Sequence, residues 1–592
     1  MSAIRHTATL LFFVTTGCAA SCGHDRTVYQ AFFSQYPVPI SISPDGTKVL
    51  LKTRYAADFE ISVFDLSNAK ILGSGRSKAT QLSTTWNPNG DAIVYLTNPS
   101  GNENYHMYLW DLRTWKTFGL DLPTTTTVMP PIRWSFDGRY LAYFVSGAGE
   151  KKAGLRVVDF QDRSAPRSFF ATASYPDGDF AWSTKGYSLA FVSPDEHGTV
   201  VVIDPLEREK SLPKALPIVP GGDIRDIAWS LDGTFLLVSV RAPSDEHNQL
   251  RQVDLRSQTN RILVPAGQWN LSHPRPMDES GRFAYQVNQD GQIHLNTADL
   301  SGRVRNLTET NEGVYDLLGV SPSATKLFAL ETSLVRPPQI VSISVGDDES
   351  DKIILYPKER TKGADGKKAE IIRVTASDGL QIPAYVWRAD RVAGIEPAAV
   401  IRVHGGPHLQ ESPRWDAGIQ LLLSHGISVI VLNYRGSAGF GASFEKWSAP
   451  DLAAKDVLAA QRYVRDTLLI PVDRIYLFAT SWGSLVGGYA LANWPDDFAG
   501  VIFVAPLVNK KLADGALAKT HFMLAFHGQE DPMCGTQLAY QELVRWFGRP
   551  LSSESWRVFA GEGHVFRRTD SWVTTYTEIL QALEKRLRRP HL

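Results

Sequence analysis

Three residues in the C-terminal third of the chain have the side chains and the order that nucleophilic acyl transfer requires. Ser481 stands in Ala-Thr-Ser-Trp-Gly, Asp531 ends His-Gly-Gln-Glu-Asp, and His564 ends Gly-Glu-Gly-His. A serine hydroxyl becomes a nucleophile when a histidine takes its proton and a carboxylate orients that histidine and stabilises its cation. Serine is common in turns, so Ser481 alone is a weak signal, but three residues of the right type in this order are far more specific. The sequence therefore predicts a catalytic triad of Ser481, Asp531 and His564.

The elements that must position these residues alternate between strands and helices after residue 370. Such alternation indicates βαβ crossovers and a mostly parallel sheet, in which ligands bind beyond the C-terminal ends of the strands. Each triad candidate directly follows a predicted strand, and the chain order is that of an α/β-hydrolase. The predicted strands are 371–375, 382–387, 398–403, 428–432, 475–478, 500–504, 522–526 and 555–559, and the predicted helices are 418–424, 452–466, 485–493, 536–547 and 574–588.

Two further loops follow predicted strands of this sheet. His404-Gly405-Gly406-Pro407 follows the strand 398–403, and its N–H groups can face the site beside the serine. A transition-state oxyanion needs two donors, and we expect them to be the N–H groups of Gly406 and Trp482. The loop 433–441 has a glycine spacing that superficially suggests a phosphate loop, but no Lys-Ser or Lys-Thr follows it, so we interpret it as the floor of the site.

The first half of the chain is a repeat. Turns that end in glycine recur at Gly46, Gly90, Gly138, Gly186, Gly233 and Gly281, with a degenerate seventh at Ala324, and neighbouring turns are 43 to 48 residues apart. A tryptophan precedes four of the turns, and an aspartate near a strand end follows each of the first six; we expect both residue types to be structural. A period in the high forties with short apolar strands is typical of four-stranded blades, and seven units predict a seven-bladed β-propeller.

Composition and charge exclude several classes of protein. The 592 residues are 43% hydrophobic and 21% charged, which is globular composition. Lys and Arg number 61 against 62 Asp and Glu, which excludes a strongly basic nucleic-acid binder. The three cysteines cannot form a disulfide scaffold or an all-cysteine zinc site, and the 14 histidines show no metal-ligand spacing, so we predict no metal and no cofactor.

The N-terminus has the layout of an export signal. Arg5 and His6 precede the apolar run 8–14, and small residues lead to Cys18 and Cys22. Thr15-Thr16-Gly17-Cys18 is similar to a bacterial lipoprotein cleavage site, although Thr15 stands where Leu or Val is usual. We therefore expect an exported protein, periplasmic or secreted, with Cys18 as a candidate lipid attachment site. The sequence has no run of 18 apolar residues, so we expect no transmembrane span after processing.

The combination of a propeller with these loop motifs resembles the prolyl oligopeptidase family of serine peptidases (S9), and within it the acylaminoacyl-peptidase and dipeptidyl-peptidase branch. The motifs that carry the resemblance lie between residues 404 and 568. It implies a serine hydrolase that acts on short peptides, with the propeller restricting access. By motif match it implies Ser481 as nucleophile with Asp531 and His564 as its partners. It also implies Gly406 and Trp482 in the oxyanion hole.

Several positions depart from the family pattern. Ala479 and Ser484 replace the outer glycines of the family's elbow, and Met533 stands where members often carry an Arg or Asn that binds a substrate carbonyl. The segment 507–520 is much shorter than the family's usual insertion, which forms helices lining the S1 pocket. His404, Tyr434 and Met533 are the candidate substrate-binding residues.

Three functions remain open from sequence. The first is a serine peptidase cleaving short peptides, the second a carboxylic-ester hydrolase with the same triad, and the third a catalytically impaired binding protein that uses its propeller surface. The expected boundaries are a signal peptide at 1–22, a propeller at 23–345, a linker at 346–369 and an α/β-hydrolase domain at 370–592.

Overall fold

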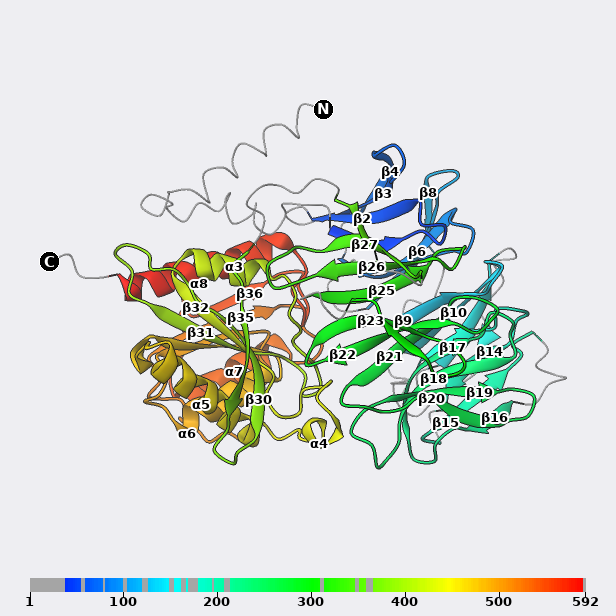
Figure 1. Cartoon of the computed structure of the whole chain (residues 1–592). Helices are drawn as coiled ribbons and strands as arrows, with labels where there is room; N and C mark the ends of the chain where they lie inside the picture. The colour runs from blue at the N-terminus through cyan, green and yellow to red at the C-terminus, as the bar shows by residue number, and fades with distance from the viewer. Residues whose placement is uncertain are drawn as a thin grey trace.

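A computed structural model of the chain shows two domains side by side (Figure 1). The structure describes residues 366–588 without a gap. Before them it describes residues 38–357, except 55–58, 78–79, 99–103, 120–125, 148–153, 161–166, 169–178, 194–195, 207–212, 309–312 and 347–350. The expected leader 1–22, with Cys18, lies outside the described residues. No helix among the described residues is long and apolar enough to cross a membrane.

The N-terminal domain is the predicted seven-bladed β-propeller. Each blade is one antiparallel sheet of four strands that follow one another in the chain. The first strands of neighbouring blades pack against one another, so these strands surround the central axis. The first four blades are β1 (Val38–Ile42), β2 (Lys48–Arg54), β3 (Phe59–Asp65) and β4 (Lys70–Ser77); β5 (Thr80–Trp86), β6 (Ala92–Asn98), β7 (His106–Asp111) and β8 (Lys116–Gly119); β9 (Thr126–Trp134), β10 (Tyr140–Gly147), β11 (Gly154–Asp159) and β12 (Arg167–Ser168); and β13 (Phe180–Trp182), β14 (Leu189–Val192), β15 (Thr199–Ile203) and β16 (Lys214–Pro217).

The last three blades complete the ring. They are β17 (Asp223–Trp229), β18 (Phe235–Arg241), β19 (Gln249–Asp254) and β20 (Asn260–Val264); β21 (Asn270–Pro276), β22 (Phe283–Gln289), β23 (Gln292–Ala298) and β24 (Val304–Asn306); and β25 (Val314–Val320), β26 (Lys326–Thr332), β27 (Gln339–Ser344) and β28 (Lys352–Tyr356). Ile42, Val49 and Leu51 of the first blade share one buried cluster with Phe328 and Ile340 of the seventh. Side-chain packing therefore joins the two blades, and among the described strands none of either blade pairs with the other blade.

The recurring tryptophans and aspartates are structural, as the repeat predicts. The Trp182 indole donates to the Arg133 carbonyl and the Trp229 indole to the Ala181 carbonyl, so each ties its own blade to the preceding one. The aspartates accept backbone N–H groups of the turn that follows them, as Asp254 does from Arg256 at 3.0 Å. Such bonds satisfy turn amides that no strand partner reaches.

The C-terminal domain is the predicted α/β-hydrolase sheet of eight strands in the order β29-β30-β32-β31-β33-β34-β35-β36. The pairs β29–β30 and β30–β32 are antiparallel and all others are parallel. One apolar cluster covers each face, so the central strands are buried on both sides, while the edge strand β29 is largely exposed. The strands are β29 (Glu370–Thr375), β30 (Gln381–Trp387), β31 (Ala398–Val403), β32 (Ile427–Leu432), β33 (Ile475–Thr480), β34 (Gly500–Val504), β35 (Phe522–Gly528) and β36 (Trp556–Phe559).

The helices match the five predicted stretches, with one addition. They are α3 (Ala417–Ser424), α5 (Pro450–Thr467), α6 (Gly483–Asn493), α7 (Thr536–Phe547) and α8 (Thr569–Leu587), together with a 3₁₀ turn at Val472–Arg474. The single-turn helix α4 (Ala442–Glu445) lies between the predicted loop 433–441 and the predicted helix 452–466 and reaches toward the propeller (Figure 1).

The expected boundary between the domains needs one correction. We placed the end of the propeller at 345 and a linker at 346–369, but β28 lies inside that interval and pairs antiparallel with β27. The charged residues on both sides of the strand concealed it, although the strand itself, Lys-Ile-Ile-Leu-Tyr, is mostly apolar. The propeller therefore extends to Tyr356.

Candidate active site

Ser481 occupies a sharp turn between β33 and α6. Its φ of 50° lies in the left-handed region, which a residue with a side chain adopts only where the surrounding structure holds it. Its N–H is bonded to the Val504 carbonyl at 3.1 Å. A Cβ atom on Gly483 would lie 2.4 Å from the Val403 carbonyl oxygen, so only glycine lets the helix start this close to β31. The predicted elbow is therefore present.

The two departures from the usual elbow glycines fit this turn. Ala479 is fully buried in the core cluster beneath the elbow. Ser484 is also buried, and its hydroxyl donates to the Ala479 carbonyl at 3.3 Å. Its polar atom therefore has a partner, and the two substitutions leave the strand–turn–helix geometry intact.

The three triad candidates meet at the carboxyl edge of the sheet. Ser481 Oγ lies 2.7 Å from His564 Nε2, and His564 Nδ1 lies 2.8 Å from Asp531 Oδ2. Both distances are those of hydrogen bonds. His564 can therefore take the Ser481 proton while Asp531 accepts from the other ring nitrogen.

Asp531 is held in its ionised form. Its Oδ1 accepts the N–H groups of Met533 and Cys534, at 2.8 and 3.0 Å. Burial favours the neutral acid, but the hydrogen bond and the charge of His564, with the Cys534 N–H, outweigh it and hold the pKa of Asp531 below its ordinary value. A charged carboxylate is what a histidine needs to remain basic toward serine.

The His404–Pro407 loop lies against the nucleophile. A Cβ atom on Gly405 would stand 2.8 Å from Ser481 Cβ, so the loop backbone passes directly beside the serine. Trp482 is the N-cap of α6, and N–H groups at a helix start have no partner within the helix. The structure therefore places the loop that contains Gly406 beside Ser481, and Trp482 directly follows the serine, while their role as oxyanion donors stays a prediction.

Two of the predicted substrate-binding residues are placed differently from our expectation. His404 and Tyr434 are both buried and their rings stack at 4.3 Å. The Tyr434 hydroxyl lies 3.1 Å from the carbonyl oxygens of His404 and Gly406. Burial lowers the pKa of His404, which keeps it neutral, and raises that of Tyr434. Since their polar atoms are used within the chain, these side chains support the oxyanion loop rather than reach a substrate.

Met533 and the shortened segment remain at the open side of the site. The Met533 side chain is 62% exposed, while its N–H is fixed by Asp531. Residues 505–521, all described, contain no helix. The Arg545 guanidinium of α7 fixes this segment by donating to the carbonyls of Asn509 and Leu512.

Sequence reasoning missed Glu562, which shapes the turn carrying His564. Its buried carboxylate accepts the N–H groups of Arg567 and Arg568, both at 3.0 Å, and burial raises its pKa. The one signal for it is an acidic residue between two glycines directly before the histidine. Glu562 therefore stabilises the turn that holds His564 in place.

A cavity of about 710 Å³ lies where the propeller meets the hydrolase domain. Its hydrolase side is formed by Gln410, Ser412, Arg414, Ala438, Gly439 and Glu445, and its propeller side is rich in amides such as Asn248, Asn270, Gln286 and Asn288. Ion pairs join the domains around it: Arg241 with Glu445, Arg414 with Asp316 and Arg373 with Asp290. The cavity is thus a polar chamber beside the loops that build the oxyanion site.

Comparisons with known proteins agree with this architecture. A sequence profile of the prolyl oligopeptidase family matches residues 413–521, which include Ser481. Acylamino-acid-releasing enzyme 2 of Oryza sativa subsp. japonica is 22% identical over 41% of this chain, and the chain spans only 34% of that enzyme's length. Dipeptidyl aminopeptidase BIII of Pseudoxanthomonas mexicana is 21% identical over 79% of this chain and 70% of its own.

Solved structures of similar fold include peptidases of this kind. A structure from a study of two prolyl endopeptidases superposes with a TM-score of 0.76 at 15% identity, over 98% of this chain and 93% of its own. The chain thus has the fold of these structures, and its residues 413–521 match the sequence profile of the prolyl oligopeptidase family.

Proposed function

We propose that this protein is a serine peptidase that hydrolyses short peptides through an acyl-enzyme. The observation that carries the proposal is the continuous hydrogen-bonded series Ser481–His564–Asp531 at a strained elbow. Strain and a complete triad at one strand end are costly to maintain without a catalytic role. This favours an active enzyme over a binding protein that has lost its chemistry.

The proposed reaction has two halves. Ser481 Oγ attacks the peptide carbonyl while His564 Nε2 takes its proton, and the N–H groups of Gly406 and Trp482 bind the oxyanion of the tetrahedral intermediate. His564 then gives the proton to the leaving amine, and the C–N bond breaks. In the second half a water attacks the ester carbonyl, His564 takes its proton and returns it to Ser481, and the free acid leaves.

The size of the substrate is limited in this proposal by the propeller. The chamber between the domains is within the range of small-ligand pockets and is walled by polar side chains that can bind a peptide main chain. A few residues fit there and a folded protein does not. We also propose that the protein is exported, on the basis of its N-terminal pattern. Intact-mass analysis of native protein tests this, and an unprocessed Met1 start contradicts it.

Labelling with a fluorophosphonate tests the proposed chemistry, because only an activated serine reacts. We expect one label on Ser481. We also expect S481A to lose both the label and peptide turnover, by about 10⁴-fold or more, with an unchanged unfolding temperature. S424A on α3, outside the site, is the matched control and keeps both. Turnover by S481A within a few-fold of wild type would show that the nucleophile is another residue.

The alternatives have their own outcomes in the same experiment. Wild type that takes no label is a binding protein. Wild type that is labelled and cleaves nitrophenyl esters but no aminoacyl anilides or peptides is an ester hydrolase. Cleavage of both substrate types supports the peptidase, since amides are the harder substrates.

A further inference from the structure

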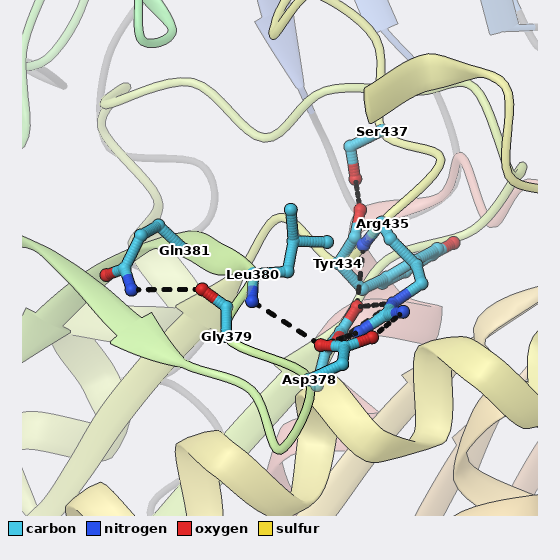
Figure 2. Close-up of polar contacts among 8 residues, drawn as sticks. Asp378, Gly379, Leu380, Gln381, Tyr434, Arg435 and Ser437 are labelled. Atoms are coloured by element: carbon cyan, nitrogen blue, oxygen red, sulfur yellow. Dashed lines mark hydrogen bonds and ion pairs between the residues drawn. The ribbon is translucent and has the colours of Figure 1, made fainter. Parts of the chain in front are cut away.

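A buried arginine, Arg435, lies between Tyr434 and Ser437 in the loop that follows β32 (Figure 2). The Arg435 side chain is 3% exposed, and its guanidinium contacts two carboxylates, one on each side. Nη1 and Nη2 contact both oxygens of Asp378, at 2.7 and 3.1 Å. Nε and Nη2 contact Oδ1 of Asp456, at 3.0 and 2.7 Å. A planar guanidinium that meets carboxylates on two edges has one orientation available to it.

This cluster joins three separate elements. Asp378 lies in the turn between β29 and β30, Asp456 lies on α5 and is fully buried, and Arg435 follows β32. The backbone is fixed as well, because the Arg435 N–H donates to Asp456 Oδ2 at 2.8 Å. Both the main chain and the side chain of the loop are therefore locked at this residue.

The residues near Arg435 in the same loop contact the His404–Pro407 loop, which lies beside Ser481. Tyr434 directly precedes Arg435, and the Tyr434 hydroxyl bridges the carbonyls of His404 and Gly406. Ser437 follows two residues later, and its Oγ lies 2.8 Å from His404 Nε2. The Ser437 hydroxyl also faces the Tyr434 carbonyl (Figure 2), at 2.7 Å, so its single proton serves either that oxygen or His404 Nε2. The 434–437 loop thus contacts the His404–Pro407 loop through the hydroxyls of Tyr434 and Ser437.

His404 in turn sets the direction of the expected donor. Its Nδ1 lies 2.8 Å from the Gly405 carbonyl oxygen, which can only accept, so Nδ1 carries a proton. In a trans peptide the C=O and the N–H point in opposite directions. Holding the Gly405 carbonyl on the histidine therefore turns the Gly406 N–H away from the ring.

We propose that Arg435, clamped by Asp378 and Asp456, is a positioning residue for the oxyanion hole. It acts through Tyr434, Ser437 and His404 on the Gly406 N–H and touches no substrate itself. The inference rests on the proposed function, because it assigns Gly406 a role in stabilising the transition state. It predicts that loosening the cluster weakens transition-state binding more than substrate binding.

R435K tests the proposal, because it keeps the charge and loses the fork that spans both carboxylates. We expect kcat to fall by about ten- to a hundredfold, because a misplaced oxyanion donor causes a loss of this size. We expect KM to stay within about twofold of wild type. The affinity for a peptide boronic acid, whose adduct with Ser481 places an oxygen at the oxyanion position, falls by a similar factor. The affinity for the product peptide stays the same.

R388K is the matched control, since Arg388 pairs with Glu370 on the neighbouring hairpin strands and does not contact the 434–437 loop. It should leave kcat and boronic-acid affinity unchanged. A lower unfolding temperature for R435K with wild-type kcat and boronic-acid affinity overturns the inference, because the cluster then serves stability alone. If R435K does not fold, D378N replaces it, since Asp378 is half-exposed. Unchanged kcat in D378N overturns the inference, and a smaller loss than predicted for R435K, with KM preserved, supports it.

The wild type is assayed in parallel, so the two proposals can fail separately. A wild type without turnover or serine label contradicts the proposed function and this inference with it. An active wild type beside a fully active R435K variant contradicts the inference alone.

Discussion

Gly528 and Gly563 lie against each other beneath the triad: a Cβ atom on Gly528 would stand 2.1 Å from the Gly563 carbonyl oxygen. Gly528 ends β35 in the loop that leads to Asp531, and Gly563 directly precedes His564. The N–H of Glu530 also donates to the Glu562 carbonyl at 2.9 Å. The spacing between Asp531 and His564 therefore depends on a close backbone contact at two glycines, which have no side chains.

G528A should consequently separate these loops. The methyl group meets backbone atoms that cannot rotate away, so His564 must move relative to Asp531. We expect a loss of about a hundredfold in kcat/KM and of about 1–3 kcal/mol in the free energy of unfolding. Steady-state kinetics and thermal unfolding measure the two effects. G535A in the same loop is the control, because nothing lies within 4 Å of its Cβ position. Equal activity of the two variants would show that the loop contact does not set the triad.

Asp378 should make the stability of the protein depend on pH in the acid range. The hydrogen bonds and charge of Arg435 lower its pKa to about 2, against an ordinary value of 3.8. A carboxylate with a depressed pKa in the folded state stabilises the protein above its unfolded pKa, and this stabilisation is lost as the pH falls toward 2. D378N should therefore lower the stability near pH 6 and flatten its dependence between pH 4 and 2. Urea unfolding at a series of pH values measures this. Parallel curves for the two proteins would contradict the expected linkage.

M533R should improve peptide turnover. Met533 is exposed beside the triad, and its position is one where members of the family often carry Arg or Asn for a substrate carbonyl. A charge-assisted hydrogen bond contributes about 1.5–3 kcal/mol, so we expect kcat/KM for peptides to rise about ten- to a hundredfold. M533L, which adds no donor, serves as the control. A gain of the same size in M533L would attribute the effect to shape rather than to the hydrogen bond.

Turnover should depend on the size of the substrate. We expect the polar chamber between the domains, with the ion pairs around it, to admit short peptides and exclude folded chains. The segment 507–520 is shorter than the family's usual insertion, so we expect the limit to be looser than in relatives that carry the insertion. A ladder from dipeptide to folded protein measures it, and equal rates at both ends would contradict gating by the propeller.

Much of this architecture could be predicted because it repeats or follows a simple period. The glycine-ended turns recur at nearly constant spacing, and the eight apolar runs of the second domain match β29 to β36 within a few residues. The triad was predictable because Ser481, Asp531 and His564 each directly follow such a run. The local sequence pattern was sufficient to predict the position of a residue that directly follows a strand, because the end of the strand fixes that position.

The rest depends on contacts between residues far apart in the chain. Arg435 is 57 residues from Asp378 and 21 from Asp456, and no local pattern pairs them. His404 and Tyr434 have side chains suited to binding a substrate, and only packing shows that the chain itself uses them. β28 was missed because the charged residues that flank this short strand on both sides resemble a linker.

The closure of the propeller has a mechanical consequence. Between the first and seventh blades the described residues form an apolar cluster, whereas each hydrogen-bonded ladder that the structure describes in the propeller lies within one blade. The two edges can therefore part by a small distance while all ladders remain whole, at the expense of a few apolar contacts. The ring is thus held closed by apolar packing between its first and seventh blades, so its circumference can vary slightly without loss of any strand pairing.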